Sequence, residues 1–169
     1  VDAAERLRRF GEGADDFVAR RVVRSTHFEV DAAPETVFPL LCPVREREWL
    51  ENWEAAIVYS ASGVVEDGCI FTTVSPLLGE ALYVTSRHEP EAGRVEFVVF
   101  FPGRCVQKLD IAVSPRAGGG SRLRWSRTYT GLTHEGNAVI ERITEEVFQK
   151  QMTELARSLS RHVTQLERQ

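Results

Sequence analysis

The feature that most constrains the fold is a run of strand-like segments separated only by turns. Period-2 alternation and a high content of β-branched and aromatic residues predict strands over 54–60, 69–74, 81–88, 95–101, 106–114 and 123–130. The connections contain Gly and Pro, as in Pro102-Gly103 and Gly118-Gly119-Gly120. Because these connections are too short to hold crossover helices, consecutive strands must pair antiparallel.

Helical segments flank this run on both sides. A strand over 22–30 comes first, and a Pro-initiated short helix with an apolar face at Val37, Phe38, Leu40 and Leu41 follows it. A second short helix is predicted over 44–50, with residues 45–48 facing water. Thr133 is expected to cap one long helix that ends near Leu166.

These elements predict one α+β domain, because a chain of 169 residues suffices for a single core. We expect a curved antiparallel sheet of about seven strands wrapped around a long C-terminal helix, with two short helices after the first strand. This arrangement is a helix-grip fold. Residues 21–169 would form this domain, and residues 1–20 an accessory arm with a short amphipathic helix.

Three stretches resemble a known superfamily. They are 33–38 (Ala-Pro-Glu-Thr-Val-Phe), 41–46 (Leu-Cys-Pro-Val-Arg-Glu) and 129–133 (Tyr-Thr-Gly-Leu-Thr). With the order of elements, they are similar to the SRPBCC or START-like (Bet v 1-like) superfamily, in particular to polyketide cyclase and dehydrase-like bacterial members of unassigned function. The resemblance covers nearly all of residues 22–166 and implies a hydrophobic cavity between the sheet, the long helix and the short helices.

Strand alternation and this resemblance together give a set of candidate ligand-binding residues. The side chains expected to wall or gate the cavity are Trp49, Trp53, Phe71, Phe97, Val99, Trp125, Arg127, Tyr129, Phe148 and Met152. For each of them taken singly, packing in the core is the alternative, and the two Trp residues could instead fasten the short helices to the sheet.

Arg127 is the most informative member of this set, because a guanidinium on an apolar face needs an anionic partner when it is buried. It could anchor a ligand carboxylate through two hydrogen bonds. The alternatives are an ion pair with Glu54, Glu141 or Glu145, or a position in water at the rim of the sheet.

Binding of a small hydrophobic or amphipathic ligand, without assigned catalysis, is the function that this pattern favours. The alternative is a polyketide cyclase or dehydratase-like enzyme for an aromatic or polyketide substrate, in which Arg127, Tyr129 and His88 polarise a carbonyl or move a proton. An interaction module that uses an exposed apolar patch, with the arm helping homodimerisation, is a third hypothesis.

Composition narrows the classes of partner and cofactor that we expect for this chain. A formal net charge of −4 gives no basic stripe for nucleic acid, and no apolar run reaches the length of a membrane span. Cys42, Cys69 and Cys105 lack CxxC spacing, which favours reduced core thiols and a cytoplasmic location. The four histidines show no metal-binding spacing, so neither a metal nor a cofactor is expected, and no catalytic residue is assigned.

Overall fold

The computed structural model describes residues 17–169, so most of the predicted arm lies outside the described residues. A single antiparallel sheet contains seven strands in the order β1-β7-β6-β5-β4-β3-β2. The strands are β1 (Arg21–Val30), β2 (Ala55–Tyr59), β3 (Ile70–Ser75), β4 (Gly79–Glu89), β5 (Arg94–Phe101), β6 (Cys105–Pro115) and β7 (Ser121–Gly131). The predicted sheet and its sequential pairing are confirmed.

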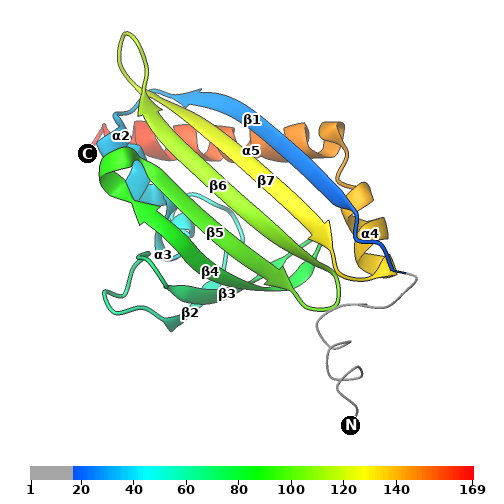
Figure 1. Cartoon of the computed structure of the whole chain (residues 1–169). Helices are drawn as coiled ribbons and strands as arrows, with labels where there is room; N and C mark the ends of the chain where they lie inside the picture. Colours follow the sequence, from blue (N-terminus) through cyan, green and yellow to red (C-terminus); the bar gives the residue numbers. More distant parts are fainter. Residues whose placement is uncertain (1–16) are drawn as a thin grey trace.

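One face of this sheet is covered by the helix α5 (Glu145–Leu166), which runs along the strands behind β1 and β7 in Figure 1. Alternate residues of the strands point toward this helix, as the burial of Val95, Phe97, Val99 and Phe101 on β5 illustrates. The long helix therefore buries the apolar face of a curved sheet, and the helix-grip fold is confirmed.

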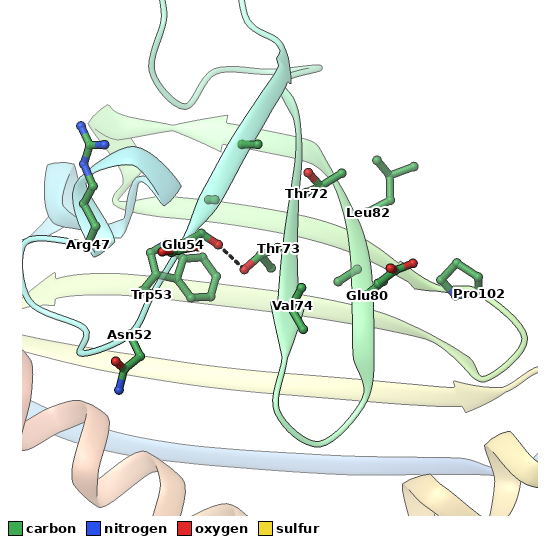
Figure 2. A pocket seen from close by; sticks show the side chains of 13 residues that line it. Arg47, Asn52, Trp53, Glu54, Thr72, Thr73, Val74, Glu80, Leu82 and Pro102 are labelled. Atoms are coloured by element: carbon green, nitrogen blue, oxygen red, sulfur yellow. Dashed lines mark hydrogen bonds between the residues drawn. The ribbon is translucent and has the colours of Figure 1, made fainter.

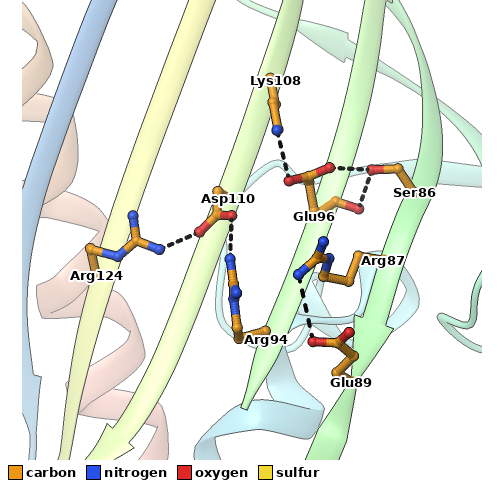
Figure 3. A network of polar contacts seen from close by, with 8 residues as sticks. All are labelled: Ser86, Arg87, Glu89, Arg94, Glu96, Lys108, Asp110 and Arg124. Atoms are coloured by element: carbon orange, nitrogen blue, oxygen red, sulfur yellow. Dashed lines mark hydrogen bonds and ion pairs between the residues drawn. The ribbon is translucent and has the colours of Figure 1, made fainter. Parts of the chain in front are cut away.

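The other face of the sheet carries charged side chains (Figure 3). Asp110 accepts hydrogen bonds from Arg94 at 3.2 Å and from Arg124 at 2.6 Å, while Lys108 lies 3.1 Å from Glu96. Each pair has one solvent-exposed basic partner, and ion pairs at a protein surface contribute little to stability. These charged pairs identify the solvent-facing side of β4–β7.

The predicted single helix from Thr133 to Leu166 is wrong, because two helices occupy this segment. Thr133 caps α4 (His134–Glu141) by accepting a hydrogen bond from the Gly136 N–H at 2.9 Å. Thr144 then caps α5 in the same way, accepting from the Val147 N–H at 3.2 Å with an extended backbone. Buried Ile143 precedes this cap, where a hydrophobic staple fixes the angle at which a chain enters a helix.

The two predicted short helices are present between β1 and β2. α2 (Pro34–Val37) continues into a 3₁₀ turn, η1 (Phe38–Leu41), and α3 (Pro43–Glu46) follows; a further 3₁₀ turn, η2 (Pro90–Ala92), joins β4 to β5. α3 ends at Glu46, four residues earlier than the predicted Leu50. The indole N–H groups of Trp49 and Trp53 donate to the carbonyls of Leu40 and Pro43, both at 2.9 Å, so each Trp ties down this segment.

The three cysteines are unpaired and buried, as expected for small core residues. Burial raises the pKa of the Cys105 thiol to about 12, which leaves it protonated and a poor nucleophile. Within residues 17–169, no helix is long and apolar enough to cross a membrane.

Candidate functional site

A cavity of about 710 Å³ lies between the sheet and α5. It reaches solvent between the loop that follows α3 and the β3–β4 turn, where Asn52 and Leu77 border it. The apolar part of its wall includes Leu50, Leu78, Phe101, Ile143, Met152 and Leu155. Both the volume and the apolar wall are typical of sites that enclose small molecules.

Four polar side chains also border this cavity: Tyr83 from β4, Gln107 from β6, and Arg127 and Tyr129 from β7. They converge because Gln107 pairs with Tyr129 across β6 and β7, and alternate residues of one strand share a face. Within residues 17–169, none of the four side chains makes a hydrogen bond to another protein group. Of their polar atoms, only the Arg127 Nε is fully enclosed without a partner, so the other polar atoms are free to bind a molecule that enters the cavity.

Arg127 is held between aromatic rings. Its guanidinium carbon lies 6.0 Å from the ring centroid of Trp125 and 5.9 Å from that of Phe148, and its Nε is buried without a hydrogen-bond partner. The rings compensate part of the positive charge but offer the guanidinium no oxygen acceptor.

The carboxylates considered as partners of Arg127 are engaged or lie elsewhere. Glu141 pairs with Arg20, Glu145 lies 3.8 Å from Arg24, and the side chain of Glu54 is not within 4.0 Å of Arg127. Among the described residues, Arg127 therefore has no ion pair.

Glu46 was placed wrongly by the sequence analysis, because it is half-buried and does not simply face water as predicted. Desolvation raises its pKa to about 8, although the positive charge of Arg127 lowers it. The side chain keeps some accessible surface and is nevertheless strongly desolvated, although it is not among the residues that border the cavity. The missed signal is helical spacing, since Glu46 lies three and four residues before the inward-facing Trp49 and Leu50.

Tyr83 is the second residue that the sequence analysis missed. Its ring stacks on Phe71 at 4.6 Å between centroids and meets Phe97 edge-on at 5.9 Å. Burial raises the pKa of Tyr83, so its hydroxyl stays protonated and can donate a hydrogen bond. The signal was available, because Tyr83 alternates with Ala81 and Thr85, which are both buried.

The predicted ligand-binding residues divide into two groups. Trp53, Arg127, Tyr129 and Met152 border the cavity. The others are buried in the surrounding core and are not part of its wall; they are Trp49, Phe71, Phe97, Val99, Trp125 and Phe148. Their contact with a ligand stays a prediction.

A second hollow, of about 930 Å³, lies over β2, β3 and β4 (Figure 2). Thr73, whose hydroxyl donates to the Glu54 carbonyl at 2.6 Å, belongs to its wall together with Arg47, Glu80 and Pro102. It shares Asn52, Trp53, Thr73 and Val74 with the inner cavity, so the two hollows adjoin at its mouth. We regard the inner cavity as the site, since the unpartnered polar groups lie there.

Other candidate chemistry lies away from the cavity. The His88 ring packs on Phe38 at 5.6 Å and does not border the cavity, so it does not join Arg127 and Tyr129 there, as the alternative hypothesis allowed. Among residues 17–169, there is no group of three or more His, Cys, Asp or Glu side chains that could hold a metal ion.

Comparison with known proteins gives matches in structure only. No family model matches the sequence, and no curated protein matches it. A START superfamily protein from Mycobacterium smegmatis has a TM-score of 0.63 at 14% identity, over 85% of this chain and 98% of that one. Norcoclaurine synthase from Thalictrum flavum has a TM-score of 0.64 at 14% identity, over 86% of this chain and 88% of that one.

An uncharacterised protein from Rhizobium leguminosarum is similar to the same extent, with a TM-score of 0.61 at 15% identity over 90% of this chain and 98% of that one. These neighbours include an enzyme and proteins without a stated activity, so the similarity supports the fold and does not indicate an activity. The resemblance seen in the sequence is confirmed at this level: the chain has the helix-grip fold of the START-like superfamily.

Proposed function

We propose that this domain binds a small amphipathic molecule in its internal cavity. The observation that carries the proposal is the combination of an apolar wall with four polar side chains that lack a partner in the described protein. An apolar molecule alone would leave these polar groups desolvated and unpaired, which is costly. A ligand with an apolar body and at least one polar group satisfies both parts of the wall.

The mouth of the cavity supports a role in enclosing a ligand. Trp53 borders both hollows at the point where they adjoin, and its indole is held by the Pro43 carbonyl. An aromatic side chain at this place is suited to cover the apolar part of a bound molecule.

The test uses a cavity-filling variant and a neutral fluorescent probe, N-phenyl-1-naphthylamine. Leu155 borders the cavity, so the larger side chain in Leu155→Trp should occupy part of the cavity volume. The affinity for the probe should fall by about tenfold or more. Val98→Trp places the same side chain on the solvent-facing side of β5, where 38% of the valine is exposed, and should bind as wild type does. Equal binding by Leu155→Trp and wild type, or no binding at all, would contradict the proposal.

The proposed setting follows from composition. Three unpaired, buried thiols support a reducing, cytoplasmic compartment. The formal net charge of −4 argues against nucleic acid as the partner. Homodimerisation stays a prediction, and the mass of the protein in solution would test it.

A further inference from the structure

The surroundings of Arg127 indicate which charge a ligand in the cavity carries. The residue lies in the middle of β7, opposite Arg24 on β1 and opposite Leu109 on β6. Neither neighbour offers an acceptor, and its Nε is enclosed without a hydrogen bond. Arg127 also borders the cavity, so an anion that enters there can supply the oxygen acceptors that the described protein does not offer the guanidinium.

A comparison with Arg24 shows that no protein group balances the positive charge of Arg127. Arg24 donates from its Nε to the Ile143 carbonyl at 2.9 Å and lies 3.8 Å from Glu145. Arg127, directly across the strand pair, has no such partner among the described residues. Like charges opposite one another destabilise a sheet, so the unpaired member of the pair is the one that favours an anion.

The remaining charges do not neutralise Arg127. Glu46 is the carboxyl that interacts with it through the interior, and burial keeps this carboxyl protonated at neutral pH. Glu51, Glu154, Arg157 and Arg161 border the mouth, where their side chains are exposed and screened by water and salt. The interior therefore holds a net positive charge.

We propose that the ligand is a small organic anion whose acidic group binds Arg127 while its apolar body fills the cavity. This inference rests on the proposed function, since it names the class of molecule that the cavity holds. Tyr83, Gln107 and Tyr129 border the same cavity and can donate further hydrogen bonds to the acidic oxygens. A carboxylate, sulfonate or enolate attached to an aromatic or aliphatic body has this chemistry.

Two probes with the same aromatic body separate charge from apolar burial. 1-Anilinonaphthalene-8-sulfonate carries one negative charge, and N-phenyl-1-naphthylamine carries none. Wild type should bind the sulfonate about ten- to hundredfold more tightly than the amine, as expected for hydrogen bonds to a charged group. Arg127→Met should remove this preference and leave the affinity for the amine unchanged.

The matched control is Arg122→Met, which removes an exposed arginine from the other face of the same strand and should keep the preference. Arg127→Gln provides a second variant in case Arg127→Met fails to fold, and its preference should also be lost. If wild type binds both probes equally, or if the preference survives in a folded Arg127 variant, the anion proposal is overturned while ligand binding stands. If neither probe binds wild type, both proposals fail.

Discussion

Glu46 and Arg127 interact through the interior of the fold, yet they do not form an ion pair. The Arg127 charge lowers the pKa of Glu46, while desolvation raises it by more, and the result is a pKa of about 8. At neutral pH the Glu46 carboxyl is therefore protonated. The cost of burying the carboxylate exceeds the attraction that Arg127 provides.

This relationship predicts how stability depends on pH. Glu46 ionises near its ordinary pKa of 4.5 in the unfolded chain and near 8 in the folded one, so the folded state holds the extra proton between these values. The free energy of unfolding should fall as pH rises through this window, with a contribution of up to about 1.4 kcal/mol per pH unit, and stay level above it. Glu46→Gln should lack this contribution in urea denaturation from pH 5 to 9.

The control for this measurement is Glu51→Gln, which removes the same charge at an exposed position. Its free energy of unfolding should follow the wild-type pH profile. A Glu46→Gln profile parallel to that of wild type would show that Glu46 titrates in the folded protein as it does in the unfolded chain.

The same pair predicts how binding of an anion depends on pH. Above about pH 8 the Glu46 carboxylate forms and neutralises Arg127, so it competes with the sulfonate of 1-anilinonaphthalene-8-sulfonate. Burial keeps the Tyr83 hydroxyl protonated in this range. Sulfonate affinity should therefore fall between pH 7 and 9 in wild type and stay constant in Glu46→Gln. Fluorescence titrations measure both, and a fall of equal size in the variant would rule out this competition.

The sequence predicted the sheet almost strand by strand because its signal is local. Each strand alternates over at least five residues, and Gly or Pro marks nearly every connection, so the pairing of consecutive strands from β2 to β7 needed no information from distant parts of the chain. The pairing of β1 with β7 was not predicted, because it joins the two ends of the domain. Arg127 was found for a related reason, since alternation along β7 puts it on the face of Trp125 and Tyr129.

What the sequence analysis missed depends on contacts between elements. Glu46 lies within a run of charged residues, which is typical of a solvent-facing helix, and only its spacing to Trp49 and Leu50 indicates otherwise. The break before α5 was missed because Thr144 resembles an ordinary helical residue until its side chain is seen to cap Val147. Which aromatic residues border the cavity and which pack around it is decided by the curvature of the sheet, and strand alternation carries no such information.

Tyr83→Phe separates the hydroxyl from the ring. The ring makes the contacts with Phe71 and Phe97, while the hydroxyl has no partner in the described protein, so stability should change by less than about 0.5 kcal/mol. Sulfonate affinity should fall by about three- to tenfold, because one donor to the acidic group is lost. Tyr59→Phe removes an exposed hydroxyl on the edge strand and should change neither quantity. Unchanged sulfonate affinity in Tyr83→Phe would exclude this hydroxyl from the binding site.

Thr144→Ala tests the cap that separates the two C-terminal helices. The Thr144 hydroxyl accepts from the Val147 N–H, and neighbouring Ile143 borders the cavity and bonds Arg24 through its carbonyl. Loss of the cap should lower the free energy of unfolding by about 1 kcal/mol, while Thr144→Ser should retain most of it. Thr153→Ala is the matched control, because Thr153 lies on the exposed side of α5. Since alanine favours a helix interior, this substitution should not lower the free energy of unfolding. If Thr144→Ala unfolds at the same urea concentration as wild type, the break is held by the burial of Ile143 and not by the cap.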